Sequence, residues 1–221
     1  MQPTPPVNYG VILFPGFQAL DVFGTLDVLN ILSTSRHLNL YILAASLDPI
    51  STKHNMSGCP SSDFGESVVP THTFTDPPVD LEVLLIPGGR GTRDEEAMKP
   101  VVYFVRDTYS KLSYLLTVCT GSAVLARTGI LDRRRATSNK KSWAWVTAQG
   151  PKVEWVPKAR WVVDGNIWTS SGITVGMDLI YAFVEHVYSG KIAEDIANAS
   201  EYERHVDPND DPFAGIWKAG A

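Results

Sequence analysis

The chain has 221 residues, with 24 acidic and 19 basic side chains, a formal net charge of -5 at pH 7 and only two cysteines. The acidic excess disfavours a nucleic-acid-binding protein, which normally presents a concentrated basic surface. Two cysteines cannot build a disulfide scaffold, and a chain of this length can bury a core without disulfides or a structural metal. Hydrophobic residues at 44% and charged residues at 19% exclude a disordered protein.

Short apolar runs alternate with longer helical stretches, which is the pattern of a mostly parallel sheet flanked by helices. The expected order is strand 9–14, helix 20–32, strand 38–45, an excursion over 46–80 with a short hairpin around 56–64, strand 81–86, helix 94–112, strand 115–118 and helix 123–128. Three short strands follow at 153–156, 160–163 and 167–169, and then two helices at 173–188 and 191–200. We therefore predict an α/β fold, a three-layer sandwich with a mostly parallel central sheet.

No repeat, low-complexity tract or domain boundary interrupts this pattern. We expect a single domain over residues 1–221, with its core at about 9–200 and a polar tail at 201–221 on the surface. The first residues lack the pattern of a secretory signal, and no run approaches the roughly 20 apolar residues that span a membrane. Together with the cysteine usage, this favours a cytoplasmic protein that does not bind membranes.

Cys119 is the strongest candidate for a reactive side chain. It stands where a buried strand meets a helix, and Gly121, Ser122 and Ala123 follow it. Small residues permit a sharp turn that presents a side chain at the carboxyl edge of a parallel sheet, where such folds place their sites. Backbone N–H groups at the start of the helix would also stabilise a thiolate. The alternative is a small buried hydrophobic residue.

A glycine-rich segment, 87–91, ends another predicted strand. The backbone N–H groups of Gly88 and Gly89 could hold an oxyanion or another developing negative charge. A dinucleotide-binding loop is disfavoured because Asp94 occupies the place of the last glycine in that pattern. The alternative is a tight turn without a further role.

Asp21 lies at the start of the first predicted helix, inside the apolar stretch 19–23. As a structural residue it would cap the helix or interact with the helix dipole. As a functional residue it would meet the Cys119 thiol at the carboxyl edge of the sheet and act as a general acid and base.

These motifs together resemble the DJ-1/PfpI superfamily, which has a flavodoxin-like fold of the class I glutamine amidotransferase type. The resemblance extends from about residue 9 to residue 200, and it is carried by four segments in the same order along the chain: 13–24, 86–89, 118–122 and 169–173. The Phe-Pro-Gly opening followed by Leu-Asp and the Cys-Thr-Gly-Ser elbow look most like the isonitrile (isocyanide) hydratase branch.

The resemblance implies that Cys119 is the nucleophile, Asp21 the general acid and base, and Thr120 a residue beside the nucleophile. It also implies that backbone N–H groups near Gly88 and Gly89 contact the substrate. A proton from Asp21 would let the thiolate add to an isonitrile, and water would then release an N-substituted formamide from the thioimidate on Cys119. The expected ligand is a small-molecule substrate, with no metal or organic cofactor, and the expected assembly is a homodimer.

Two departures separate the chain from other branches. PfpI-type peptidases have a histidine directly after the nucleophile, where this chain has Thr120. Glyoxalase and deglycase relatives use a glutamate near the first helix and a histidine after the elbow helix, where this chain has Asp21 and Asn139. The resemblance therefore favours a hydratase over a glyoxalase or deglycase.

Two other kinds of function are open. A DJ-1-like redox or stress-response protein would use the same cysteine, because an accessible low-pKa thiol oxidises readily. A non-catalytic ligand-sensing module is the last alternative, since related domains occur fused to DNA-binding regions, but no helix-turn-helix pattern follows Ser200.

The remaining candidate residues favour structural roles. The five histidines show no metal-ligand spacing, and His186 is expected to be structural within its helix. Cys59 is expected to be a loop cysteine, at an interface if it has a partner. The three arginines at 133–135 are expected to form a solvated turn.

Overall fold

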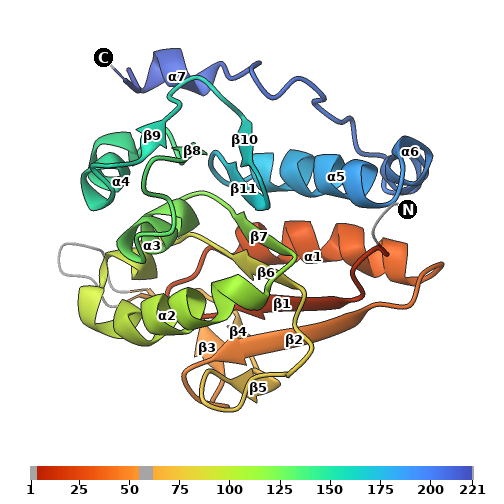
Figure 1. The fold of residues 1–221 in the computed structure, drawn as a ribbon, viewed down its shortest axis with the longest axis horizontal. Helices are drawn as coiled ribbons and strands as arrows, with labels where there is room; N and C mark the ends of the chain where they lie inside the picture. Colours follow the sequence, from red (N-terminus) through yellow and green to blue (C-terminus); the bar gives the residue numbers. More distant parts are fainter. Residues whose placement is uncertain (1–3, 55–61, 221) are drawn as a thin grey trace.

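The computed structural model describes residues 4–54 and 62–220. Its centre is a seven-stranded sheet in the order β10-β11-β7-β6-β1-β2-β5, in which every neighbouring pair is parallel except β10 and β11 (Figure 1). The strands are β1 (Asn8–Ile12), β2 (Asn39–Ala44), β5 (His72–Thr73), β6 (Val83–Ile86), β7 (Tyr114–Thr117), β10 (Trp161–Asp164) and β11 (Ile167–Ser170). The predicted α/β class with a mostly parallel sheet is confirmed.

Helices cover both faces of the sheet and complete the three layers (Figure 1). One layer contains α1 (Ala19–Ser33), α5 (Val175–Val187) and α6 (Gly190–Ala199), which contact one another. The other contains α2 (Glu95–Thr108), α3 (Gly121–Arg127) and α4 (Trp143–Gln149). Strands β1 and β6 are buried along their whole length, because helices shield them on both sides.

The excursion after β2 differs from its predicted form. An antiparallel pair joins β3 (Ile50–Ser51) to β4 (Ser67–Val68), so its strands flank the predicted hairpin. The first part of that hairpin, 56–61, lies outside the described residues. The excursion also supplies the edge strand β5, which was not predicted because two residues carry no readable periodicity.

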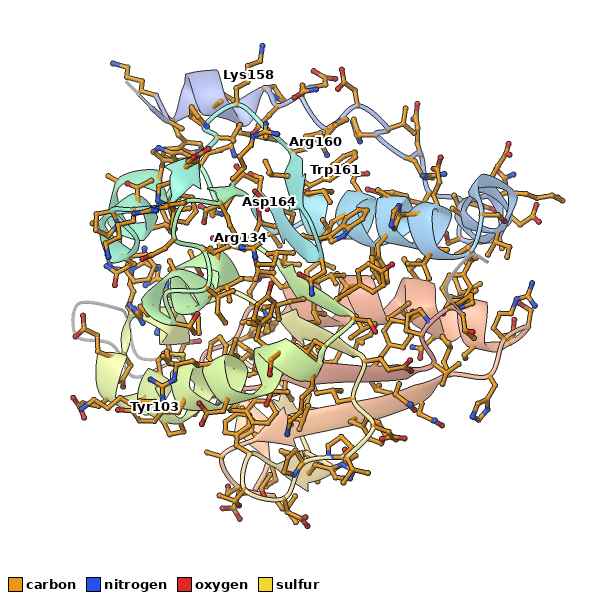
Figure 2. The ribbon with its side chains drawn as sticks, in the orientation of Figure 1. Tyr103, Arg134, Lys158, Arg160, Trp161 and Asp164 are labelled. Carbon is orange, nitrogen blue, oxygen red and sulfur yellow. The ribbon has the colours of Figure 1, made fainter. Side chains whose placement is uncertain are left out.

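Other short elements also escaped prediction. Strand β8 (Arg135–Ala136) was not predicted, and it pairs in a small separate sheet with β9 (Glu154–Trp155), which lies within the predicted strand 153–156. The short helices α4 and α7 (Phe213–Ile216) were not predicted either. Short 3-10 turns flank α2, at Arg90–Arg93 and Tyr109–Lys111. Arg134 pairs with Asp164 of β10 at 3.2 Å, which ties the small sheet to the edge of the large one (Figure 2).

The C-terminal segment is more than a polar surface tail. Most of its side chains are exposed, as expected, but Asp211 and Ala214 are buried. Its backbone also contacts the residue that precedes β10, because the N–H of Arg160 donates to Pro208 O at 2.7 Å. Arg160 lies at the start of β10, beneath this segment, in Figure 2. The C-terminal segment therefore packs against the fold near its edge strand β10.

Within the part of the chain that the structure describes, none of the helices combines the length and the apolar character needed to cross a membrane.

Candidate active site

The strand-to-helix turn expected at Cys119 is present. Cys119 lies between β7 and α3 with a φ of 58°, a left-handed conformation that directs its side chain out of the turn. Its N–H donates to Ser171 O at 3.2 Å, and the Ser138 hydroxyl donates to its carbonyl at 2.9 Å. Gly121 is required after it, since a Cβ there would lie 2.3 Å from Ile86 O. The thiol-bearing residue is only 6% exposed.

Asp21 occupies the first turn of α1 but does not cap the helix. The N-cap residue is Gln18, and the Asp21 carboxyl instead accepts a hydrogen bond through Oδ2 from the Gly88 N–H at 2.8 Å. The capping alternative is therefore wrong. Asp21 is fully buried, and the bond to Gly88 brings the end of β6 and the start of α1 together at one edge of the sheet.

The electrostatics of Asp21 suit proton transfer near neutral pH. Burial raises the pKa of its carboxyl to about 7, although the hydrogen bonds from Gly88 and the Cys119 side chain act in the opposite direction. The carboxyl interacts with the Cys119 thiol, and its Oδ1 has no partner within hydrogen-bond distance among the described residues. This oxygen is free to give or take a proton.

The thiol of Cys119 rests in its neutral form. Burial and, second, the negative charge of Asp21 raise its pKa, while the N–H groups of Thr120 and Ile173 and the side chain of Asn139 lower it. The helix-start N–H groups thus act in the expected direction. They are outweighed, so the expectation of a low-pKa thiol is not met.

The predicted oxyanion role of Gly88 and Gly89 requires correction. The N–H of Gly88 donates to Asp21, and that of Gly89 donates to the Thr120 hydroxyl at 3.0 Å, so neither points to a substrate. Close packing explains the glycine at 88, where a Cβ would lie 2.5 Å from Thr120 N and 2.9 Å from Cys119 Cβ. These glycines hold the Asp21 carboxyl beside the Cys119 thiol.

The side chain of Thr120 belongs to the same supporting network. Its hydroxyl accepts from Gly89 N, donates to Gly89 O at 3.3 Å and lies 3.1 Å from the Thr92 hydroxyl, which itself donates to Gly89 O at 2.7 Å. Thr120 therefore serves the site through its backbone N–H beside the sulfur, while its side chain fixes the glycine turn.

Sequence reasoning missed two residues that contact the sulfur, Asn139 and Ile173. Asn139 Oδ1 accepts from Ser142 N at 3.0 Å, which leaves its Nδ2 group to donate. Nδ2 lies against Gly172, where a Cβ would be only 1.9 Å away, so only glycine fits there. Both residues gave a signal in the sequence, since Asn139 replaces a histidine of related branches and Ile173 ends the fourth shared segment.

The other candidates lie apart from this site or are not described. His186 packs against the rings of Tyr114 and Trp168, with centroids 6.2 Å and 5.4 Å away. No group of three metal-binding side chains occurs in the described ranges. Cys59 lies outside the described residues.

Comparison with known proteins agrees with this geometry. Residues 10–186 match the model of the DJ-1/PfpI family. The chain belongs to the DJ-1/PfpI family. It is 32% identical over 197 residues to an isonitrile hydratase of Pseudomonas putida, covering 89% of this chain and 78% of the relative.

Two further relatives show the range of the family. A deglycase of Pyrococcus horikoshii is 32% identical over 96 residues, which is 43% of this chain and 55% of the relative. The crystal structure of a ThiJ/PfpI family protein from Pseudomonas syringae superposes with a TM-score of 0.75 at 29% identity, covering 91% of this chain and 77% of that one. The family is thus firmly assigned, and both a hydratase and deglycases belong to its relatives.

Proposed function

We propose that this protein is a cofactor-independent isonitrile hydratase that uses Cys119 as nucleophile and Asp21 as general acid and base. The observation that carries the proposal is the isolated carboxyl–thiol pair. One Asp21 oxygen is held by Gly88, the other has no hydrogen-bond partner among the described residues, and the carboxyl interacts with the Cys119 thiol. Such a pair can pass one proton back and forth, which is what hydration of an isonitrile requires.

In the first step the thiol adds across the terminal carbon of the isonitrile. Asp21 takes the proton of Cys119, and the resulting thiolate forms a C–S bond to that carbon. The same proton moves from Asp21 to the carbon as a C–H bond, and one N–C π bond is lost. The product is a thioimidate on Cys119, and Asp21 is again a carboxylate.

In the second step water adds to the C=N bond of the thioimidate. Asp21 accepts a proton from water and passes it to the nitrogen, while the hydroxide forms a C–O bond to the carbon. The tetrahedral intermediate then breaks its C–S bond and releases an N-substituted formamide. The proton of its hydroxyl group moves to the Cys119 thiolate, which restores the starting pair.

The surroundings of the thiol suit a neutral, narrow substrate. Cys119 is 6% exposed, and Asp21 is the one charged group that influences its pKa. The terminal carbon of an isonitrile is uncharged and carries no substituent other than nitrogen, so it needs neither a counter-ion nor a wide entrance. The hydrogen bonds from Thr120, Ile173 and Asn139 would stabilise the negative charge on sulfur as the thiolate forms.

The test is conversion of cyclohexyl isocyanide to N-cyclohexylformamide by the purified protein, followed by gas chromatography. Cys119→Ala should show no turnover, and Thr34→Ser, a conservative change at an exposed position just after α1, is the control. Full turnover by the Cys119→Ala variant would overturn the mechanism. Absence of formamide with the wild-type protein over a panel of isonitriles would overturn the function.

A deglycase or glyoxalase is the second candidate, supported by the deglycase relatives. Against it stands Asn139, a neutral amide beside the sulfur, where an imidazole would be needed for a further proton transfer. A panel of 2-oxoaldehydes decides between the two, and turnover restricted to these substrates would favour the second candidate. A redox role is less favoured, because a buried thiol of raised pKa reacts slowly with peroxide.

The expected homodimer and the cytoplasmic location form part of this proposal. Sedimentation of the purified protein at several concentrations tests the first.

A further inference from the structure

The loop between β8 and α4 supplies two consecutive residues that touch the nucleophile. The Ser138 hydroxyl donates to Cys119 O at 2.9 Å, and the Asn139 side chain hydrogen bonds to the sulfur. Thr137 fixes the start of the loop, since its N–H donates to the Thr169 hydroxyl at 2.9 Å. The position of this short loop therefore sets the surroundings of the thiol.

The next residue, Lys140, is a buried lysine that holds the loop from behind. Its side chain is 1% exposed. Its Nζ donates to the Thr137 hydroxyl at 2.7 Å, to Ser138 O at 3.1 Å and to Ala159 O at 2.9 Å. Two of these three acceptors belong to the loop itself, so the ammonium group defines the backbone path that leads to Asn139.

The counter-ion of this lysine comes from the C-terminal segment. Asp211 Oδ2 lies 3.2 Å from Lys140 Nζ, and the Asp211 side chain is equally buried. Its other oxygen accepts from the N–H of Phe213 at 2.9 Å, which anchors the carboxylate to the start of α7. Among the described residues, this is the one carboxylate that forms an ion pair with Lys140.

We propose that the Lys140–Asp211 ion pair is a positioning element of the active site, through which the C-terminal segment keeps Ser138 and Asn139 against Cys119. Asp211 keeps the buried lysine charged, and the charged lysine keeps three donors for the loop and Ala159. Burial lowers the pKa of Lys140 to about 8, and the charge of Asp211 opposes that change. Without the carboxylate, a neutral amine would hold the loop with fewer donors.

A purely structural pair would behave differently from a positioning pair. Loss of a structural pair lowers the free energy of unfolding and leaves the chemistry of the folded molecules unchanged. Loss of a positioning pair also weakens the hydrogen bond from Asn139 to the sulfur, which normally lowers the pKa of the thiol. The two cases are separated by measuring the reactivity of Cys119 in folded protein.

The experiment uses Asp211→Asn, with Asp210→Asn as the matched control, because Asp210 is an exposed neighbour in the same segment. Alkylation of Cys119 by iodoacetamide is followed from pH 6 to 10 by mass spectrometry of its peptide. We expect the Asp211→Asn profile to move to higher pH, with a rate at pH 8 about tenfold lower, as for loss of one hydrogen bond to a charged group. The control should match the wild type.

The turnover readout rests on the proposed function, whereas the alkylation readout does not. With an isonitrile, we expect Asp211→Asn to lower kcat about tenfold with little change in KM, because the pair never touches the substrate. If the wild type hydrates no isonitrile, the proposed function fails and the alkylation profiles still decide the positioning role.

A second variant guards against misfolding. In Lys140→Met combined with Asp211→Leu, apolar side chains replace both charges, an exchange that buried ion pairs commonly tolerate. We expect it to fold and to show the same shift in the alkylation profile. Asn139→Ala should also give this shift, and adding Asp211→Asn to it should give no more. The proposal would be overturned if Asp211→Asn and the double variant both fold and have the same alkylation profile as the wild type.

Discussion

Two buried aspartates, one in the first turn of α1 and one in the first turn of α5, have opposite surroundings. Asp178 in α5 pairs with the guanidinium of Arg160 and also accepts from the Tyr202 hydroxyl at 2.9 Å and from His205 N at 3.1 Å. Asp21 in α1 accepts from Gly88 N and has no basic partner among the described residues. A buried carboxylate is stable when its charge is compensated and reactive when it is not.

The difference explains what each residue does for the protein. Asp178 joins three segments, since Arg160 precedes β10 and Tyr202 and His205 belong to the C-terminal segment. Asp21 instead leaves one oxygen free beside a nucleophile. Its burial has an energetic cost at neutral pH, and that cost provides an acid–base group whose pKa lies near 7.

The largest expected effect is on catalysis at Asp21. Asp21→Asn preserves the shape of the side chain and removes its proton transfer, so isonitrile turnover should fall by roughly 10²- to 10⁴-fold. Steady-state kinetics measure the loss, and circular dichroism checks the fold. Turnover within about threefold of the wild type would remove Asp21 from the mechanism.

The converse substitution at Asp178 should act on stability. Asp178→Asn leaves the buried guanidinium of Arg160 without its counter-ion, so the free energy of unfolding should fall by about 3–5 kcal/mol. Urea unfolding measures this change. Asp195→Asn, in an exposed pair with Lys191, is the control and should change stability by less than about 0.5 kcal/mol. An unchanged unfolding midpoint for Asp178→Asn would show that Asp178 does not stabilise the fold, contrary to the difference inferred between Asp178 and Asp21.

Gly88→Ala tests the single hydrogen bond that holds Asp21. The added methyl would lie 2.5 Å from Thr120 N, so the turn must shift and move the Gly88 N–H away from the carboxyl. We expect kcat to fall by roughly 10²-fold, as for a small misplacement of reacting groups. Gly215→Ala, where a Cβ meets no atom within 4 Å, should leave kcat unchanged. Equal activity of both variants would contradict the assigned role of the turn.

The pH dependence of turnover should report the shared proton. The active pair holds one proton, whereas below the pKa of Asp21, about 7, both groups are protonated and no base remains. Hence kcat/KM should rise about tenfold per pH unit up to about 7 and then level off. A profile that is flat from pH 5 to 8 would show that Asp21 does not titrate in this range.

A last expected effect is on the pH dependence of stability. The pKa of Asp21 is raised from 3.8 to about 7, so between these values the unfolded chain releases a proton that the folded protein keeps. Stability is therefore lost as pH rises through this window, and Asp21→Asn should remove that loss. By pH 8 the variant should gain on the order of 4 kcal/mol relative to the wild type, compared with pH 4. Parallel stability curves would refute the raised pKa.

Much of the fold and the centre of the site could be predicted because their signals are local. Buried strands such as β6 are continuous apolar runs, and the small residues after Cys119 indicate a sharp turn. The motifs also predicted that Asp21 and Cys119 lie close together, and the structure places their side chains in contact. Elements of two to four residues, such as β5, β8 and α7, were missed, since their hydrogen-bond partners come from distant parts of the chain.

The predictions that failed concern groups whose partners are not local. The N–H groups of Gly88 and Gly89 face the protein rather than a substrate, and this depends on the distant residues Asp21 and Thr120. The neutral resting state of Cys119 follows from burial, which a sequence pattern does not measure. The tail is predicted to lie on the surface, but Asp211 within it is buried against Lys140.

The sequence by itself determined that this is an α/β protein of the DJ-1/PfpI type, with a cysteine at a strand-to-helix elbow and an acidic residue at the start of the first helix. These features follow from apolar periodicity and from the backbone freedom of small residues, both of which act over a few positions. Only the tertiary structure decided which polar groups are paired and which stay free, because burial and hydrogen bonding join residues far apart in the chain. Asp21 and Asp178 are the same residue type on two helices, and their neighbours alone make one an acid–base group and the other part of the scaffold.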